Sequence, residues 1–493
     1  MLVIGSRSRV RAGAVLVVAL LTQFFITSET SAPAQTASEV TGSWSAPIDL
    51  GITGVHTAVL PTGKVLLVSR KAVTTGPLAR VWNPADGTTT NVSHPTASRD
   101  IYCASHSFLA DGRLLFTGGN LRVGAKDGVK LADIFSGSSQ EWSPAPPLGQ
   151  ARWYPTSIEL GDGRVLIFGG HQKEGAWAKR VESYNKLATA RTLLPTSATR
   201  NVGLYPRLHL LPSGKLFYSG VTTDPLGSAS RLFDPGTNTW SPVVDNVNFG
   251  KRGDGMSVLL PGLQKVLAMG GSSVEKGTAT ASAEIIDLSD SAPQWRTIAP
   301  MNHARKHSNS VLLPDGKLLV VGGAFGPGNY EQPVKVAEMF DPATETWTDM
   351  AAQVAPRTHH STAVLLPDGR VLSAGGDRGT DMNTGELYSP PYLFKGPRPT
   401  LSSVPASVNY GQQFSVGTPD ASQIGRAVLV RAPAVTHSYA FDQRNVQLSF
   451  TSNASSLTVT APSSGNIAPP GHYMLFILNS DGVPSISSWI HIS

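Results

Sequence analysis

The sequence of 493 residues contains a single cysteine, Cys103. A chain with one cysteine cannot form an internal disulfide, so its stability must come from the packing of a core. Charged residues are also scarce, at 15%, and the net charge is only +6. Since the lysines and arginines form no clustered runs, nothing in the charge pattern indicates nucleic-acid binding.

Long apolar runs are nearly absent as well. The longest covers residues 12–26, follows three arginines within residues 7–11, and precedes small residues at 32–34. This pattern is typical of a secretory signal peptide over residues 1–34, and the run is too short for a membrane span. No adjacent arginine pair is present, which favours general secretion over folded export. We therefore expect a secreted protein, extracellular or periplasmic, with no membrane span.

Glycine and proline are abundant, with 49 and 36 residues, and they indicate a turn-rich, all-β protein. The clearest structural unit covers residues 357–376. Within it, the apolar run Ser361 to Leu366 is followed by the turn sequence Pro367-Asp368-Gly369 and a second apolar run, Val371 to Ala374. Two apolar runs joined by turn residues predict a β-hairpin.

The turn glycine of this hairpin recurs at intervals of 48 to 54 residues, at Gly63, Gly112, Gly163, Gly214, Gly262, Gly316 and Gly369. A period near 50 with four short strands is the kelch signature, so we predict a seven-bladed kelch-type β-propeller over residues 40–389. The period stops at a proline-rich stretch. Short alternating strands follow and predict an Ig-like β-sandwich over residues 390–493.

Equivalent positions in the repeats hold side chains that can bind a metal or take part in catalysis. Because the first strand of each blade lines the central channel, residues at one offset should face one another. The position nine residues before each turn glycine holds Gly54, Cys103, Tyr154, Tyr205, Gly253, His307 and His360. A thiol, phenols and imidazoles are costly to bury without a partner or a metal, so we predict a functional site at this end of the channel. For Tyr205 and His307, packing or hydrogen bonding in the channel wall is favoured over a role as ligands.

Copper is the metal that these donors favour, because Cu(II) prefers nitrogen and oxygen ligands in a tetragonal arrangement. His437 is a candidate for a further ligand. It lies between predicted strands of the last domain, in a loop long enough to reach the propeller axis. A loop histidine is by default solvated or bonded to the backbone, but the predicted site still lacks a donor.

Four segments together resemble the copper radical oxidases, the family that includes galactose oxidase and glyoxal oxidase. They are residues 100–103 (Asp-Ile-Tyr-Cys), 152–156 (Arg-Trp-Tyr-Pro-Thr), 357–376 and 435–444. Any one segment alone would be weak, but their order and repeat positions make the joint match specific. The resemblance implies a two-electron oxidation of a primary alcohol or hydrated aldehyde, with O₂ reduced to H₂O₂.

The resemblance also implies roles for individual residues. Cys103 matches the cysteine that a thioether bond joins to the ring of a ligand tyrosine, here Tyr154, and the crosslinked phenol is the radical cofactor beside one copper ion. His360 and His437 match the two equatorial histidine ligands.

Two positions depart from the family pattern. His359 stands where the family has the tyrosine that serves as axial ligand and as base for the substrate's hydroxyl proton. An imidazole can bind copper and accept a proton, but it is neutral where a phenolate is anionic. Gln172 stands where galactose oxidase has the tryptophan that shields the thioether, which leaves Trp153 and Trp177 as substitutes.

The substrate and the competing function follow from these features. Few residues separate the expected signal peptide from the first repeat, so no carbohydrate-binding domain is expected there, and a small alcohol or aldehyde is expected rather than a sugar. The alternative is a catalytically impaired kelch propeller with a vestigial copper site that binds a cell-surface glycan or a protein. A glycosidase is not favoured, because the central positions hold no paired carboxylates.

Overall fold

The computed structural model describes residues 36–493, except 72–76, 96–99, 122–125 and 224–226. The expected signal peptide lies outside the described residues. Helix is limited there to α1 (Ala37–Thr41) and three short 3₁₀ helices, η1 (Thr196–Ala198), η2 (Pro391–Phe394) and η3 (Ala421–Gln423). Within this part of the chain, no helix combines the length and apolar character needed to cross a lipid bilayer. The prediction of an all-β protein is confirmed.

The predicted hairpin in residues 357–376 is present. Strands β29 (Ser361–Leu365) and β30 (Val371–Gly375) pair antiparallel, with Ser361 opposite Gly375. The amide of Gly369 donates to the Leu366 carbonyl over 2.9 Å and closes the turn. Gly369 adopts φ +84°, in the left-handed region where a glycine is not strained.

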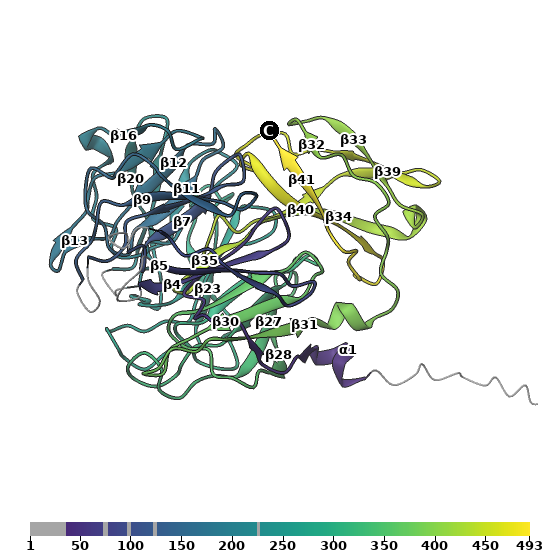
Figure 1. Cartoon of the computed structure of the whole chain (residues 1–493), viewed down its shortest axis with the longest axis horizontal. Helices are drawn as coiled ribbons and strands as arrows, with labels where there is room; N and C mark the ends of the chain where they lie inside the picture. Colours follow the sequence, from purple (N-terminus) through teal and green to yellow (C-terminus); the bar gives the residue numbers. More distant parts are fainter. Residues whose placement is uncertain (1–35, 72–76, 96–99, 122–125, 224–226) are drawn as a thin grey trace, which may run out of the picture. The chain divides into compact units, whose positions relative to one another are not determined.

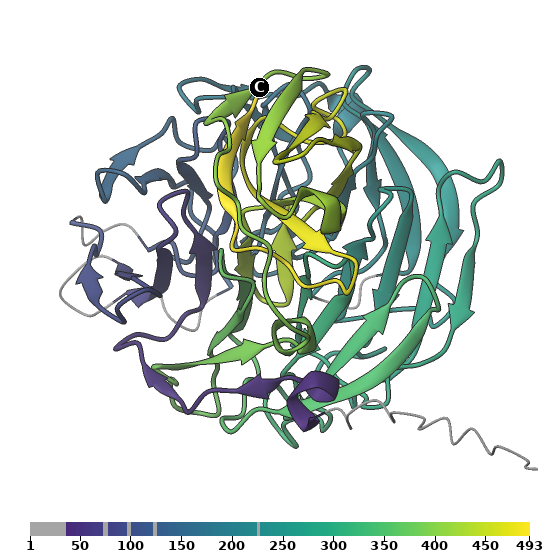
Figure 2. The ribbon, with the colours of Figure 1, turned by 90° about the vertical axis from the view of Figure 1, so that its right-hand side faces the viewer.

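The same hairpin begins each of seven sheets in the described residues, and further strands follow on its outer side (Figures 1 and 2). In the first five sheets in chain order the strands are β3 (His56–Val59), β4 (Val65–Lys71), β5 (Pro77–Trp82) and β6 (Thr89–Asn91); β7 (Ser105–Phe108), β8 (Leu114–Thr117), β9 (Ala132–Ser136) and β10 (Glu141–Pro144); β11 (Thr156–Glu159), β12 (Val165–Phe168), β15 (Glu182–Tyr184) and β16 (Arg191–Leu193); β17 (Leu208–Leu210), β18 (Leu216–Tyr218), β19 (Ala229–Asp234) and β20 (Thr239–Asn246); and β21 (Met256–Leu259), β22 (Lys265–Met269), β23 (Ala283–Asp287) and β24 (Trp295–Ile298). A separate small hairpin, β13 (His171–Lys173) with β14 (Ala176–Trp177), interrupts the third sheet.

The sixth and seventh sheets are the last two of the seven. The sixth consists of β25 (Asn309–Leu312), β26 (Leu318–Val321), β27 (Val336–Asp341) and β28 (Thr346–Ala352). In the seventh, β29 and β30 are followed by β31 (Thr384–Ser389), and the outer strands come from the other end of the region: β1 (Ser43–Trp44) and β2 (Ile48–Asp49) both pair with β31. This pairing hydrogen-bonds the first strands of the repeated region to the last repeat.

Buried arginine–glutamate pairs recur in four of the sheets. In each pair the arginine precedes the first strand and the glutamate lies on the third. The pairs are Arg152–Glu182 (3.0 Å), Arg252–Glu284 (2.5 Å), Arg305–Glu338 (2.5 Å) and Arg357–Glu386 (3.2 Å). The arginines also donate to backbone carbonyls, and the carboxylates accept from backbone amides of the preceding connection. These contacts satisfy charges that would otherwise be expensive to bury.

The C-terminal residues form two further sheets. One contains β32 (Ser407–Val408), β34 (Ile424–Arg431), β37 (Asn445–Leu448), β40 (Gly471–Asn479) and β41 (Ser488–Ile492); the other contains β33 (Gln413–Gly417), β38 (Phe450–Ser452) and β39 (Ser456–Thr460). Apolar side chains of both sheets, such as Val416, Val459 and Leu475, share one buried core, which continues onto Phe217 and Trp295 of the repeated region. Burial of this apolar surface holds the C-terminal sheets against the repeats.

One C-terminal hairpin leaves these two sheets. His437 lies between strands, as the sequence predicted, in a tight turn between β35 (Ala434–Thr436), which Figure 1 labels, and β36 (Tyr439–Phe441). Strand β35 pairs with β3 of the first sheet, His56 opposite Thr436. The added strand satisfies backbone groups at the inner edge of β3, which explains why this segment is extended rather than irregular.

Candidate metal centre

The residues at the predicted offset share a backbone conformation. Cys103, Tyr154, Tyr205, His307 and His360 all have positive φ, at 64°, 60°, 42°, 55° and 63°. Left-handed φ is uncommon in non-glycine residues and often marks a functional site. Neighbouring members are also joined directly: the Tyr154 amide donates to the Cys103 carbonyl over 3.1 Å, and the Tyr205 amide donates to the Tyr154 carbonyl over 2.7 Å. The repeat therefore does bring these distant positions side by side.

His437 reaches this group from the tip of the β35–β36 hairpin, where His437 and Ser438 have φ of 45° and 64°. The Thr436 hydroxyl lies 2.7 Å from the Val55 carbonyl and 2.7 Å from His437 Nδ1. Because the hydroxyl has one proton and gives it to the carbonyl, it must accept from the Nδ1–H of His437. The lone pair of His437 is then on Nε2, which lies 3.9 Å from the Cys103 sulfur.

His360 is oriented in the same way by a carboxylate. Asp377 Oδ2 lies 3.5 Å from His360 Nδ1. The donor atoms of Cys103, His360 and His437 all lie within 4.8 Å of one another. An acceptor on Nδ1 leaves Nε2 available to a metal, and such an outer partner fixes the orientation of a ligand imidazole.

His359 takes a different position from its neighbour. Its ring lies 3.7 Å from the His360 ring and 4.7 Å from the His307 ring, centroid to centroid. It forms a group with His360 and Asp377, not with Cys103. Of the two adjacent histidines, His360 is therefore the one whose donor lies within the Cys103 and His437 group, and His359 lies beside it.

Tyr154 lies between aromatic neighbours. Its ring stacks on the Trp153 indole at 3.8 Å with an angle of 16°, and lies 4.6 Å from the His437 ring. Trp177 instead contacts His171, at 4.1 Å. Trp153 is thus the tryptophan that covers Tyr154. Tyr205 donates its hydroxyl proton to the Ala104 carbonyl over 2.8 Å, as a wall residue would.

The centre is buried, and burial disfavours the charged forms of its Cys103, Tyr154 and His437 side chains. Cys103, Tyr154 and His437 are exposed by only 2%, 5% and 3%. Burial lowers the pKa of His437 well below its ordinary value, and raises the pKa of the Cys103 thiol and of the Tyr154 phenol. Neutral imidazole nitrogens beside a phenol and a thiol form a donor set that suits a divalent copper ion.

Three residues around the centre had no role assigned from the sequence. Tyr102 and Thr436 lie inside the resembling segments, and Asp377 follows the Gly375-Gly376 pair, yet nothing in the sequence tells which way their side chains point. The Tyr102 hydroxyl lies 3.0 Å from His360 Nε2. The only signal for them in the sequence was that Tyr102 and Thr436 stand directly beside the candidate site residues Cys103 and His437.

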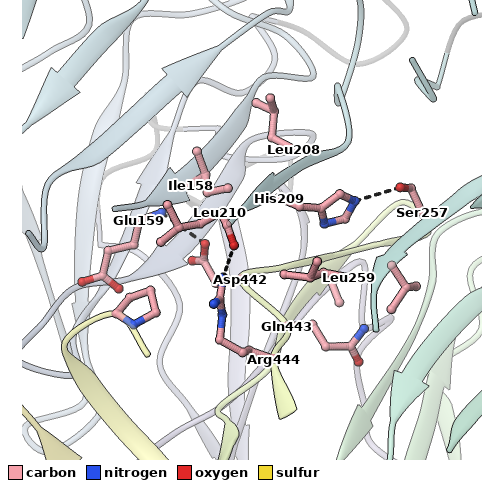
Figure 3. A pocket seen from close by; sticks show the side chains of 13 residues that line it. Ile158, Glu159, Leu208, His209, Leu210, Ser257, Leu259, Asp442, Gln443 and Arg444 are labelled. Atoms are coloured by element: carbon pink, nitrogen blue, oxygen red, sulfur yellow. Dashed lines mark hydrogen bonds between the residues drawn. The ribbon is translucent and has the colours of Figure 1, made fainter. Parts of the chain in front are cut away.

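A separate small cavity lies by the base of the hairpin that carries His437. Its volume is about 20 Å³, room for about one water, and its lining includes Glu159, His209, Ser257 and Arg444. Figure 3 shows His209 directed at the Ser257 hydroxyl, over 2.8 Å, and Arg444 directed at the Leu210 carbonyl. None of the donors of the metal centre lines it, and the contacts in it join parts of the fold: His209 joins the fourth and fifth sheets, and Arg444 joins the C-terminal chain to the fourth.

Comparison with known proteins agrees with this geometry. Residues 84–390 match the family model described as glyoxal oxidase N-terminus, and residues 398–492 match the model described as galactose oxidase-like, early set domain. A galactose oxidase of Gibberella zeae is 30% identical, over 92% of this chain and 71% of that protein. The aldehyde oxidase GLOX of Vitis pseudoreticulata is also 30% identical, over 92% of this chain and 98% of that protein.

The solved structure of a fungal alcohol oxidase in complex with copper superimposes with a TM-score of 0.81, at 25% identity, over 92% of this chain and all of that one. The fold and the buried imidazole and phenol donors thus define a copper oxidase. The chain belongs to the copper radical oxidase family, the group of galactose oxidase and glyoxal oxidase.

Proposed function

We propose that the protein oxidises a small primary alcohol or hydrated aldehyde at a copper ion held by Tyr154, His360 and His437, with Cys103 and Tyr154 joined as a thioether. The observation that carries this proposal is that Cys103, His360 and His437 bring their donor atoms to one buried point, with the Tyr154 ring 4.6 Å from that of His437. In the overall reaction, RCH₂OH and O₂ give RCHO and H₂O₂, and a hydrated aldehyde gives the carboxylic acid in the same way. When bound, copper supplies a one-electron redox couple and a site for the substrate oxygen.

The thioether would form from groups that already touch. The Cys103 and Tyr154 side chains are within hydrogen-bonding reach of each other, and both belong to one buried cluster. Joining them removes the sulfur hydrogen and one ring hydrogen beside the hydroxyl. The two electrons and two protons pass to O₂, which becomes H₂O₂. The positive φ of both residues holds their side chains toward each other before the bond exists.

The remaining side chains orient and shield. Thr436 and Asp377 fix the two ligand imidazoles through Nδ1. Trp153 covers the Tyr154 ring, which excludes water from the oxidised phenol. His359 is the candidate to accept the substrate's hydroxyl proton, because its ring lies 3.7 Å from that of His360, at the position of the family's basic tyrosine. Burial lowers its pKa, which leaves the imidazole unprotonated at neutral pH but makes it a weaker base.

The wider architecture and location belong to the same proposal. We infer that the seven sheets close as the blades of a propeller over residues 40–389, with the pairing of β1 and β2 to β31 as the closing contact. We also infer an Ig-like sandwich within residues 390–493, and secretion after removal of residues 1–34. A small alcohol or aldehyde is preferred over a sugar because the aldehyde oxidase relative is matched over nearly its whole length.

The test is to express the protein in copper-free medium, load it with Cu(II) in air, and map the peptides that contain Cys103 and Tyr154 by mass spectrometry. A single crosslinked peptide lighter by two hydrogens is expected in the loaded protein and not in the copper-free one, together with peroxide release from a panel of alcohols and aldehydes. Separate peptides and no peroxide would contradict the proposal. They would favour the alternative function, a glycan- or protein-binding module, which the comparisons do not favour.

A further inference from the structure

Arg207 is a fully buried arginine beside the metal centre, and it differs from the arginines of the four glutamate pairs. It directly precedes β17, the first strand of the fourth sheet, and is 0% exposed. Each of the four paired arginines reaches a glutamate of its own sheet. The Arg207 guanidinium instead donates to backbone carbonyls of three separate segments. Its role therefore differs from the neutralisation of a buried glutamate within one sheet.

The three carbonyls belong to residues at or near the metal centre. Nη1 of Arg207 donates to the Tyr205 carbonyl over 3.1 Å, and Nη2 donates to the Gly255 carbonyl over 3.3 Å and to the His437 carbonyl over 3.1 Å. Tyr205 occupies one of the equivalent positions of the repeats, Gly255 directly precedes β21 of the fifth sheet, and His437 is the proposed ligand at the hairpin tip. One guanidinium thus joins the fourth sheet, the fifth sheet and the hairpin.

The hairpin tip needs such support because its backbone conformation is unfavourable. His437 and Ser438 both have left-handed φ, at 45° and 64°. Non-glycine residues keep this conformation only where the surrounding contacts hold it. Thr436 holds the His437 imidazole through Nδ1, and Arg207 holds the His437 carbonyl. The direction of Nε2, the nitrogen offered to the metal, depends on both contacts.

A second contact joins Arg207 to the same hairpin. Its guanidinium carbon lies 4.8 Å from the centroid of the Tyr439 ring, in a cation–π arrangement. The Tyr439 hydroxyl donates to the Leu208 carbonyl over 2.6 Å and accepts from the Leu208 amide over 2.9 Å. Residues 207 and 208 of the fourth sheet therefore hold the hairpin at two places, His437 and Tyr439.

The positive charge of Arg207 by itself opposes the binding of a cation. Burial lowers the pKa of Arg207 to about 10, so the guanidinium is still protonated at neutral pH. Such a group repels a nearby copper ion whatever other charges surround the site. Its removal would also leave the carboxylate of Asp254, which interacts electrostatically with Arg207, free to attract the ion. Charge alone thus predicts tighter copper binding without Arg207, whereas the loss of its hydrogen bonds predicts weaker binding.

Resting on the copper site proposed above, we propose that Arg207 is the positioning residue of His437, because it binds the carbonyl at the hairpin tip and so keeps Nε2 directed at the donors of Cys103 and His360. Arg207 acts through His437 and is not itself a ligand. A planar guanidinium suits this task, since its donors spread in a fixed fork toward carbonyls of three segments. The ammonium of a lysine cannot reproduce that fork.

The experiment compares the wild type with Arg207→Met and Arg207→Lys. Arg252→Met is the matched control, because Arg252 is also buried and also donates to backbone carbonyls, but pairs with Glu284 away from the centre. Copper-free protein is loaded with Cu(II) under nitrogen, so that Cys103 and Tyr154 stay unlinked. The copper affinity, the electron paramagnetic resonance spectrum of the bound Cu(II) and the urea midpoint are then measured.

Both Arg207 variants should bind copper at least about tenfold less tightly than the wild type, as expected when the outer support of a ligand is removed. Their spectra should change as well, because the His437 nitrogen is no longer held at the copper. The Arg252→Met protein should lose stability but keep the wild-type affinity and spectrum. Since Arg207→Lys keeps the charge and loses the fork, it separates the two effects of the guanidinium, and it decides alone if Arg207→Met does not fold.

Wild-type or tighter copper binding by either folded Arg207 variant would overturn this proposal. An equal loss of affinity in Arg252→Met would overturn it too, because the loss would then follow from stability alone. Both results leave the proposed function intact, provided that the wild type binds copper stoichiometrically. If the wild-type protein holds no stoichiometric copper, both proposals fail.

Discussion

The protein buries ionisable groups in two ways. In the four arginine–glutamate pairs, each charged side chain is met by an opposite charge and by backbone groups of the same sheet, as in Arg252, which reaches Glu284 and the Gly270 carbonyl. At the metal centre, Thr436 and Asp377 contact the Nδ1 atoms of His437 and His360, and among the described contacts only the uncharged Cys103 and Tyr102 side chains lie near their Nε2 atoms. In the first arrangement, each charge is compensated by an opposite charge within the protein. In the second, imidazole, thiol and phenol groups converge on one buried point and could together take up a cation, and this convergence of donor atoms distinguishes the site from the scaffold.

The largest expected effect is the loss of oxidase activity when His437 at the metal centre is replaced. In His437→Asn, a residue that tolerates the positive φ replaces the histidine, so folding should be kept while a ligand is lost. Oxidase activity should fall by at least about a thousandfold, roughly 4 kcal/mol of transition-state stabilisation. Peroxide release and copper content measure this, with His209→Gln as the control for a buried histidine outside the centre. Full activity in His437→Asn would contradict the assignment of the ligand.

Breaking an arginine–glutamate pair should lower the stability of the protein and leave its copper binding unchanged. Arg252→Met leaves Glu284 charged and buried, which should cost about 3 kcal/mol of unfolding free energy. Copper affinity of the folded protein should not change. Urea unfolding measures the loss, and Arg296→Met, which removes a surface ion pair with Glu345, should cost at most about 1 kcal/mol. Equal losses in the two variants would show that burial of the pair does not matter.

The stability of the protein should fall in mild acid because of histidines such as His209. Burial, with Arg444 and Arg207 nearby, lowers the pKa of His209 to about 3. The unfolded chain, with the ordinary value, binds a proton below pH 6.5 while the folded protein does not, so stability is lost as pH falls. Between pH 7 and 5 the loss from this one group is at most about 2 kcal/mol. Urea midpoints at both pH values should differ less in His209→Gln; an unchanged difference would exclude this histidine as a cause.

The smallest expected effect concerns the carboxylate behind His360. Asp377→Ala removes the acceptor for Nδ1 and should weaken copper binding by about tenfold, since outer partners of ligand histidines contribute about that much. Titration of the copper-free protein measures this. Asp381→Ala, which breaks only the partly exposed pair with Arg70, is the matched control and should bind copper as the wild type does.

Periodic features of this molecule could be predicted from the sequence. The glycine spacing predicted the hairpins, and the fixed offset brought Cys103, Tyr154 and His360 together, because a repeat converts sequence position into spatial position. Features without a period could not be predicted. The pairing of β35 with β3 joins residues about 380 apart, and no local pattern encodes it. The directions of Trp153 and Tyr102 depend on the turn conformation, which the side-chain pattern does not reveal.

The hairpin that carries His437 also determines when the centre can exist. The other proposed donors lie just before the first strands of the second, third and seventh sheets, whereas His437 arrives only with residues 434–441, after every repeat has been made. A growing chain therefore lacks a complete copper site until its C-terminal sheets have been synthesised and have packed. The proposed oxidative joining of Cys103 and Tyr154 would thereby be delayed until the protein around them is finished, and a thioether between them would record that folding was completed.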